Sequence, residues 1–164
     1  MSFTIRRLGP DEGPLFRQLR LTTLRLDEIN FVATLAEEEA KPASAFDEAV
    51  RDGAVFVAEA NGVVLGLVGL MPKTNAKERH KGLIYSVFVM PEGRGKGVGR
   101  ALMTTVLDHA RSVVESVFLV AVADNRAAVS LYESVGFESY GLEPRSLLVD
   151  GAYSDDLLMW KRLK

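Results

Sequence analysis

The spacing of apolar residues in the first third of the chain predicts a strand followed by two helices. Residues 3–8 (FTIRRL) alternate between apolar and polar, as an edge strand does. Asp11 then precedes a segment with apolar residues at helical spacing, which predicts a helix capped by that aspartate. Residues 26–41 are irregular and acidic. A short second helix is predicted between Ser44, as its N-cap, and Gly53, at which it ends.

The middle of the chain predicts a hairpin, a further strand and a long helix. Two β-rich runs flank Asn61-Gly62, a pair favoured in two-residue hairpins because both residues tolerate positive φ. Residues 83–90 (LIYSVFVM) form the next predicted strand, which Pro91 ends. A helix is predicted from Gly97. Its inward face would consist of Val98, Ala101, Leu102, Val106, Ala110 and Val113.

The last third of the chain predicts a buried strand, a helix and a final strand pair. Residues 116–122 (SVFLVAV) read as the buried strand, and Asn125 caps the helix that ends before Gly136. The final two strands meet near Asp150-Gly151. The two late helices require locally parallel strands and the hairpins require antiparallel ones, so the predicted sheet is mixed.

Composition narrows the class of protein. A chain of 164 residues fits one domain, which we expect to span residues 1–164. Lys and Arg number 20 against 22 Asp and Glu, so no global field favours nucleic acid, and we expect no nucleic-acid partner. The absence of cysteine and the presence of only two histidines exclude a thiolate site and a histidine-rich metal site, and we expect no metal. The start lacks the features of a signal peptide, and the longest apolar run, residues 63–71, is too short to span a bilayer, so we expect a cytoplasmic protein without membrane contact.

A glycine-rich joint connects the strand at residues 83–90 to the helix that follows. Its four alternate glycines are Gly93, Gly95, Gly97 and Gly99. Backbone N–H groups and the positive end of a helix dipole favour an anion at such a joint. The flanking cations Arg94, Lys96 and Arg100 make the site suited to a pyrophosphate.

Two common nucleotide motifs do not fit this joint. A Walker loop needs Gly-Lys followed by Ser or Thr, but Lys96 precedes Gly97. The dinucleotide fingerprint G-x-G-x-x-G would need glycine where Arg100 stands. The spacing that does hold is Arg94-x-x-Gly97-x-Gly99 after a strand that ends VFV.

This spacing resembles the pyrophosphate loop of the GNAT superfamily of acetyl-CoA-dependent acyltransferases. A second block, DNRAAVSLYESVGF at residues 124–137, is similar to that family's pattern N-x-x-A-x-x-L-Y-x-x-x-G-F. The two blocks follow the family's order, with about thirty residues of helix and strand between them. The resemblance implies an α/β fold with a mixed, mostly antiparallel sheet of about seven strands, about four flanking helices, and a splay between the fourth and fifth strands.

The resemblance also implies a site for acetyl-CoA as co-substrate. The pantetheine arm would follow the backbone of residues 87–89, and N–H groups between Gly95 and Arg100 would hold the pyrophosphate. Asn125 would either cap its helix alone or also contact the arm. The implied binding residues are Val87, Phe88, Val89, Arg94, Gly95, Lys96, Gly97, Val98, Gly99, Arg100, Asn125 and Tyr132.

Tyr132 occupies the family's general-acid position, where its phenol would protonate the departing thiolate; the alternative is that it only packs in the core. A backbone N–H near Phe88 or Val89 would stabilise the thioester oxygen. Some relatives carry a glutamate five residues before the asparagine, but this chain has Val120 there. The base stays unassigned, with a water relay or an already neutral amine as equal alternatives. Candidates by residue type are Glu28, Glu37, Glu38, His80 and Asp124.

The implied function is transfer of an acetyl group from acetyl-CoA to a primary amine of a small molecule or protein, by direct attack in a ternary complex. The alternative is a non-catalytic acyl-CoA-binding or sensing domain. The acceptor would approach from residues 26–41, whose acidic side chains would either favour a cationic amine or only keep a helix face soluble. Tyr85 and Ser86 would shape its cleft, with core packing as the alternative for Tyr85. The final hairpin would line this cleft or form a homodimer interface.

Overall fold

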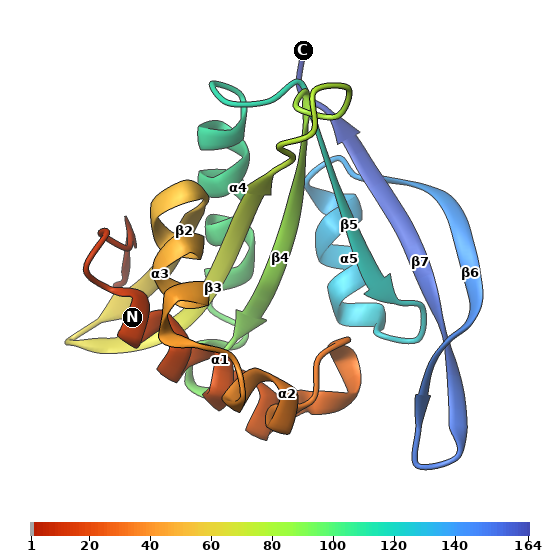
Figure 1. Ribbon diagram of the computed structural model, residues 1–164, viewed down its shortest axis with the longest axis horizontal. Helices are drawn as coiled ribbons and strands as arrows, with labels where there is room; N and C mark the ends of the chain where they lie inside the picture. The colour runs from red at the N-terminus through yellow and green to blue at the C-terminus, as the bar shows by residue number, and fades with distance from the viewer. Residues whose placement is uncertain (1) are drawn as a thin grey trace.

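The computed structural model describes residues 2–164. Its seven strands form one mixed sheet with helices on both faces (Figure 1). The strands are β1 (Thr4–Arg7), β2 (Ala54–Ala60), β3 (Val63–Pro72), β4 (Lys81–Val89), β5 (Ser116–Val122), β6 (Glu138–Val149) and β7 (Ala152–Arg162). The helices are α1 (Gly13–Asp27), α2 (Leu35–Glu39), α3 (Ala43–Asp52), α4 (Val98–Ala110) and α5 (Arg126–Ser134), with 3₁₀ turns at Glu28–Asn30 and Pro91–Gly93. The strand order is β1-β2-β3-β4-β5-β7-β6, and every neighbouring pair is antiparallel except β4 with β5. The predicted mixed, mostly antiparallel sheet is confirmed.

Both predicted two-residue hairpins are present. Asn61 and Gly62 have φ values of 51° and 75°, and Asp150 and Gly151 have 50° and 79°. Positive φ at both central residues is the mark of a type I′ turn, whose twist matches that of the flanking strands. The first turn joins β2 to β3, and the second joins β6 to β7, the long hairpin at the far edge of the sheet (Figure 1).

The parallel pair β4 and β5 separates soon after it begins. Its paired residues are Lys81–Leu83 on β4 and Ser116–Phe118 on β5. Beyond them the strands diverge towards their carboxyl ends (Figure 1), so the edge of β4 that faces β5 has no strand partner in the described chain from residue 84 onward. This separation confirms the predicted splay between the fourth and fifth strands.

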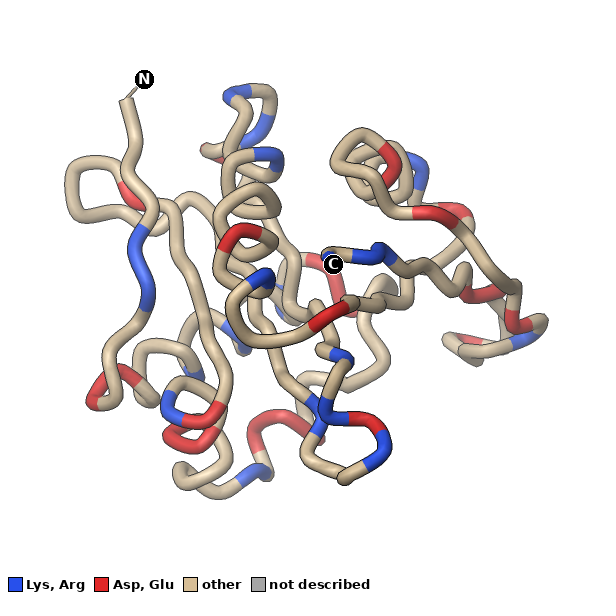
Figure 2. The backbone as a smooth tube through the Cα atoms, turned by 90° about the horizontal axis from the view of Figure 1, so that it is seen from above, with Lys and Arg blue, Asp and Glu red and all other residues tan. Residues whose placement is uncertain are grey.

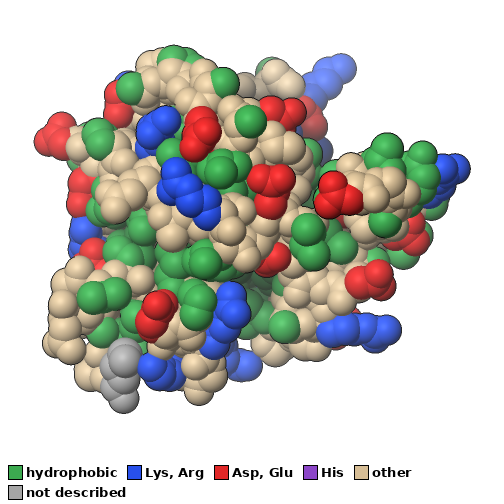
Figure 3. Space-filling view, turned by 90° about the horizontal axis from the view of Figure 1, so that it is seen from below, with side chains coloured by type: hydrophobic (Ala, Val, Ile, Leu, Met, Phe, Trp, Pro, Cys, Tyr) green, Lys and Arg blue, Asp and Glu red, His purple; other side chains and the backbone are tan. Residues whose placement is uncertain are grey.

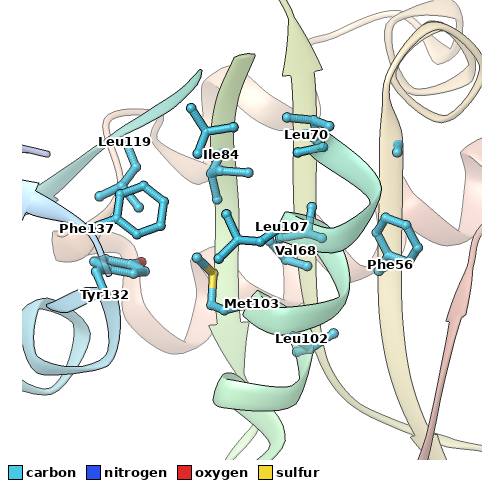
Figure 4. Packing of buried hydrophobic residues seen from close by; sticks show 14 of the residues in the cluster. Phe56, Val68, Leu70, Ile84, Leu102, Met103, Leu107, Leu119, Tyr132 and Phe137 are labelled. Atoms are coloured by element: carbon cyan, nitrogen blue, oxygen red, sulfur yellow. The ribbon is translucent and has the colours of Figure 1, made fainter. Parts of the chain in front are cut away.

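Each face of the sheet has its own hydrophobic core. On one face, α4 and α5 cover a cluster that includes Ile84, Leu102, Met103 and Tyr132 (Figure 4). On the other face, α1 and α3 cover a second cluster built around Phe16, Phe46 and Phe88. The two cores hold β4 between them, which fixes the strand that borders the splay.

Several local predictions were wrong. Asp11 and Ser44 do not cap helices: α1 begins at Gly13 and α3 at Ala43, and neither helix has a side-chain N-cap bond. Val113 does not face inward. It lies beyond the last residue of α4, where the helical spacing no longer applies, and it is 43% exposed. The strand β5 is buried on one face only, because Val120 is 45% exposed.

Residues 26–41 are more regular than predicted. A 3₁₀ turn at Glu28–Asn30 is followed by the short helix α2, which is the helix beyond the four expected. Thr34 and Glu37 start α2 with a capping box: the Thr34 hydroxyl accepts from the Glu37 N–H at 3.2 Å, and the Glu37 carboxylate accepts from the Thr34 N–H at 2.9 Å. The acidic residues of this segment therefore build local structure.

Candidate functional site

A cavity of about 1130 Å³ lies where β4 and β5 diverge. Its walls come from these two strands, the glycine joint, α5, and the segment from α1 to residue 41, with contributions from β6 and β7. In the view from below, hydrophobic side chains occupy the middle of this face, with charged side chains around them (Figure 3). Ligand sites commonly enclose about 300–1,000 Å³, so this cavity is large enough for an extended ligand together with a second, small one.

A bulge in β4 shapes the wall of the cavity. Gly69 pairs with Tyr85 and Leu67 pairs with Phe88, so Ser86 and Val87 together face the one β3 residue between those pairs. Ser86 has a φ of 54°, a conformation that is uncommon for a residue with a side chain. Bulges bend a strand and redirect its residues. Beyond this one, residues 87–89 lie in the cavity wall, as the predicted site requires.

The four glycines of the joint serve two different purposes. Gly95 and Gly97 have φ values of 72° and 78°, and a Cβ on either would meet nothing within 4 Å, so these two form an open left-handed loop before α4. At Gly93 a Cβ would lie 2.7 Å from the carbonyl oxygen of Leu65. At Gly99 a Cβ would lie 3.2 Å from a Leu131 methyl group. The second pair therefore permits close packing of the joint against β3 and α5.

The cations of the joint are held differently from one another. Arg94 lines the cavity, where its Nε donates to the carbonyl oxygen of Val89 at 3.3 Å and its guanidinium lies over the Phe88 ring, 5.8 Å from the centroid. Lys96 is outside the cavity wall and donates to the carbonyl oxygen of Glu92 at 2.6 Å. Arg100 is exposed on α4 and is also outside the wall. Ten of the twelve predicted binding residues therefore line the cavity, and Lys96 and Arg100 flank it.

Asn125 and Tyr132 place α5 against the same cavity. The Asn125 Oδ1 accepts from the Ala128 N–H at 3.3 Å, which confirms the predicted helix cap, and its side chain also lines the cavity. Tyr132 is 7% exposed and packs edge-on against Phe137, while it lines the cavity as well (Figure 4). Burial raises the pKa of the Tyr132 phenol well above its usual value, so the group is protonated at neutral pH.

Arg20, which lines the cavity, belongs to a buried ion pair with Glu38. Arg20 on α1 donates from Nε to Glu38 at 3.1 Å and from Nη1 to the Ser86 hydroxyl at 2.9 Å. Lys41 lies 3.0 Å from the other carboxylate oxygen of Glu38. Tyr85 is beside them, and its hydroxyl is buried without a hydrogen-bond partner in the described chain; burial raises its pKa to about 12. Tyr85 and Ser86 both line the cavity.

Few of the base candidates reach the cavity. Of the five, Glu37 is the one among the described residues that lines it, and its carboxylate is engaged in the capping box of α2. Glu38 is 2% exposed and ion-paired to Arg20 and Lys41, and Glu28 accepts from the Leu35 N–H at 2.9 Å. None of the five is therefore arranged as a free base.

Two charged residues of the cavity wall were not predicted from the sequence. Arg20 lies on the buried face of α1, four residues from both Phe16 and Leu24, and nothing in its local sequence indicates its partners. Asp156 is 3% exposed on β7 and lines the cavity. A carboxylate at an inward position of a strand is unusual. The place of Asp156 in the run SDDLLMW could therefore have marked it as a candidate site residue.

Charge is mixed over the molecule and in the cavity. Lys and Arg are interspersed with Asp and Glu along the chain (Figure 2). The charged residues of the cavity wall are Arg20, Asp27, Glu37, Lys41, Arg94 and Asp156. Within residues 2–164, no three His, Asp or Glu side chains are grouped to hold a metal ion. Over the same residues, every helix is too short or too polar to cross a membrane.

Comparison with known proteins finds one family. The model of the Acetyltransferase (GNAT) family matches residues 22–137. The N-alpha-acetyltransferase RimI of Mycobacterium tuberculosis is 44% identical over 69 residues, which are 42% of this chain and 42% of that protein. The chain spans about half or less of the length of the curated relatives that it matches.

Solved structures share the fold over nearly the whole chain. The structure of yncA from Salmonella typhimurium with its cofactor acetyl-CoA superposes with a TM-score of 0.84 at 23% identity, covering 100% of this chain and 95% of that one. The ribosomal-protein-alanine N-acetyltransferase from Brucella melitensis gives a TM-score of 0.82 at 26% identity, covering 98% of this chain and 99% of that one.

Proposed function

Because the chain belongs to the Acetyltransferase (GNAT) family, we propose that it is an N-acetyltransferase that transfers the acetyl group of acetyl-CoA to a primary amine. One observation carries this proposal: the unpaired edge of β4, the left-handed glycine loop and Tyr132 border a single cavity. A strand edge, an anion-binding loop and a proton donor are what a long, phosphorylated thioester requires of a protein. The Salmonella neighbour was solved with acetyl-CoA, which supports the choice of ligand.

Different residues of the cavity would bind different parts of acetyl-CoA. The backbone of residues 87–89 would pair with the amide groups of the pantetheine arm, because this edge of β4 lacks a strand partner in the described chain. The N–H groups from Gly95 to Arg100 would hold the pyrophosphate at the start of α4. Lys96 and Arg100 would contribute long-range positive charge from outside the wall, and Arg94 would act from within it. Asn125 would contact the arm while it caps α5.

Three tasks in the reaction fall to the chain. A backbone N–H near Phe88 or Val89 would stabilise negative charge on the thioester oxygen as the amine attacks. Tyr132 would give its proton to the departing sulfur, and its raised pKa keeps that proton in place at neutral pH. The apolar wall around the strand edge would exclude water, which strengthens both interactions.

Amine-dependent release of free thiol from acetyl-CoA tests the proposal. The panel contains polyamines, amino acids, aminoglycosides and peptides with a free α-amino group, the last because two relatives are named for N-alpha and ribosomal-protein-alanine acetylation. We expect thiol release with at least one amine, together with an acetylated product identified by mass spectrometry. Binding of acetyl-CoA without amine-dependent thiol release would favour the alternative of a non-catalytic acyl-CoA-binding domain, which the names of these relatives do not support. Longer acyl-CoAs in the same assay define the donor.

We further propose that residues 1–164 act as a single domain in the cytoplasm. We also propose that the chain forms a homodimer through the β6–β7 hairpin. This hairpin forms the edge of the sheet and exposes large apolar side chains. The exposed apolar residues are Tyr140, Leu142, Leu148, Val149, Tyr153 and Trp160. Patches of this kind commonly mark protein interfaces. Sedimentation velocity tests the proposal: a dimer that Leu148→Glu converts to a monomer would support it, and a wild-type monomer would contradict it.

A further inference from the structure

A buried carboxylate stands in the wall of the cavity with no cation beside it. Asp156 on β7 is 3% exposed and lines the cavity. Within the described residues, no Lys, Arg or His lies within ion-pair distance of it, and its one hydrogen bond comes from the Ser146 hydroxyl, at 2.5 Å to Oδ2. Burying an unpaired charge is unfavourable unless a partner compensates for it. The position therefore suits a cation that arrives with a ligand.

Strand alternation places Asp156 on the side of the sheet that faces away from α5. Leu157 and Met159, one on each side of Leu158, belong to the core beneath α4 and α5. Successive side chains of a strand point to opposite faces, so Asp156 points to the face that Phe88 and Tyr85 occupy on β4. Arg20 and residues 27–41 border the cavity on this same face. The carboxylate of Asp156 therefore lies on the route proposed for the acceptor.

Pairing with β5 brings Asp156 close to the middle of the splay. Asp156 pairs with Val122, and Val120 lies two residues earlier on the same face of β5. Diagonal neighbours of this kind have side chains about 7–8 Å apart. Asp156 therefore supplies a carboxylate to the splay from the strand beside β5.

A bulge in β6 holds the Asp156 side chain. Glu143 pairs with Asp156 and Leu147 pairs with Ser154, so three residues of β6 face Asp155 alone. Asp155 accepts from the backbone N–H of Arg145 at 2.8 Å, and the bulge turns Ser146 towards Asp156. Ser146 occupies one carboxylate oxygen, and Oδ1 has no hydrogen-bond partner among the described residues.

We propose that Asp156 binds the ammonium group of the acceptor and takes one proton from it, an inference that rests on the proposed acetyltransferase function. The ammonium transfers a proton to the carboxylate, and the nitrogen lone pair forms a C–N bond to the acetyl carbon. The C–S bond then breaks, its electron pair leaves with sulfur, and the second nitrogen proton reaches that sulfur by way of Tyr132. Asp156 returns its proton to solvent. The net products are the acetylated amine, the free thiol of CoA and one proton.

Several other charged groups lie around Asp156. Glu143 is its pair on β6 and Asp155 is its neighbour on β7. Across the cavity, the charges are Arg20 and Asp27 on α1, and the wall also includes Glu37, Lys41 and Arg94. Arg20 and Lys41 are engaged with Glu38, so the carboxylate of Asp156 is left for the ligand.

The test compares Asp156→Asn with Glu143→Gln, which removes one carboxylate charge from the exposed β6 residue paired with Asp156, outside the cavity wall. With a strongly basic alkylamine found in the panel, we expect Asp156→Asn to lower kcat/KM by about a hundredfold or more and to leave the KM for acetyl-CoA unchanged. With a weakly basic arylamine or hydrazide, which is neutral at the assay pH, the loss should shrink to about threefold or less. Glu143→Gln should stay within about threefold of wild type for both classes, because an exposed charge contributes little.

The outcomes separate this inference from the function it rests on. If the wild type acetylates amines and Asp156→Asn equals it, or loses activity equally with both amine classes, the role of Asp156 is overturned and the proposed function stands. If the wild type acetylates no amine, the proposed function and this inference fall together. Asp156→Ser is measured beside Asp156→Asn, and urea unfolding identifies whichever variant is folded.

Discussion

Arg20 on α1 donates a hydrogen bond from Nη1 to the hydroxyl of Ser86, 2.9 Å away at the bulge of β4. The two residues are 66 positions apart in the chain. Arg20 also donates to Glu38, so one guanidinium joins α1, α2 and the strand that borders the cavity. This link fixes α1 and α2 relative to the strand edge at which the proposed thioester would lie.

Removal of Arg20 should destabilise the protein. Arg20→Met leaves the carboxylate of Glu38 buried with Lys41 as its remaining cation, and breaking a buried pair from one side typically reduces the free energy of unfolding by about 3–5 kcal/mol. Arg25→Met is the matched control, because its pair with Glu39 is about half exposed and should contribute about 1 kcal/mol or less. Urea unfolding of both variants measures the difference. Equal losses would contradict the structural role assigned to Arg20.

The ionisation of Glu38 should contribute to the pH dependence of stability. Burial alone would raise the pKa of Glu38, but interactions with Arg20 and Lys41 outweigh it and hold the pKa below the ordinary 4.5. A carboxyl group with a lower pKa in the folded state stabilises the fold above its unfolded pKa, and this contribution is lost as the pH falls through the folded value. Glu38→Gln should therefore be less stable than wild type near neutral pH, and the difference should shrink below pH 4.5.

Urea unfolding over a pH series measures this difference. Glu39→Gln is the control, because Glu39 is exposed and its ion pair with Arg25 is long, at 3.5 Å. A gap between wild type and Glu38→Gln that is the same at all pH values would mean that the lost contribution is packing and not charge.

Local sequence predicted those parts of the fold that depend on local chemistry. The Asn61-Gly62 and Asp150-Gly151 turns follow from residues that tolerate positive φ, and the Asn125 cap follows from its side chain. The residues of the glycine joint could be named as candidates because their spacing is a contiguous motif, and Arg94, Gly95 and Gly97 are among those that line the cavity. The predicted Asp11 cap of α1 was wrong. Glu12 is the N-cap residue and makes no side-chain cap bond, and α1 starts instead with proline in its first turn.

The parts of the cavity wall at Ser86 and Asp156 could not be predicted in the same way. The bulge at Ser86 has no local signal, because its left-handed φ is set by pairing with β3 and by Arg20. Asp156 becomes part of the cavity only when β7 inserts between β5 and β6, and its hydrogen bond depends on a bulge ten residues earlier in the chain. Such features arise from long-range register, which one sequence does not display.

A substitution in the glycine loop should weaken acetyl-CoA binding. Gly97→Ala places a Cβ on a residue with a φ of 78°, which strains the loop by about 1–2 kcal/mol and shifts the N–H groups before α4. Loss of one charge-assisted hydrogen bond to phosphate corresponds to at least about a tenfold rise in Kd. Isothermal titration calorimetry with acetyl-CoA measures the change.

Gly62→Ala provides a control with nearly the same strain. Gly62 has a φ of 75° and free space around its Cβ position, but it lies in the β2–β3 turn away from the cavity. It should lose similar stability and keep wild-type affinity for acetyl-CoA. Should Gly97→Ala also bind with unchanged affinity, the pyrophosphate does not occupy this loop.

Removal of the Tyr85 hydroxyl should stabilise the protein. The oxygen is buried without a hydrogen-bond partner in the described chain, and its ring packs against Gly69, where a Cβ would lie 2.5 Å from a ring carbon. A buried polar group left without a partner is unfavourable by about 1–3 kcal/mol, so Tyr85→Phe should raise the free energy of unfolding by about 1 kcal/mol. Urea unfolding checks this value, and a loss of stability would reveal a partner for the hydroxyl.

Loss of the Tyr132 hydroxyl should reduce turnover more than binding. Tyr132→Phe keeps the ring that packs against Phe137, so stability should change little, while kcat should fall by about 10²–10⁴-fold and the Kd of acetyl-CoA should stay near the wild-type value. Because burial raises the pKa of Tyr132 above the ordinary 10.0, the wild type should show no loss of activity from its ionisation below pH 10. Steady-state kinetics over a pH series and calorimetric titration of both proteins measure these quantities. A variant with full turnover would restrict Tyr132 to packing, and one that loses acetyl-CoA affinity in proportion to turnover would make it a binding residue.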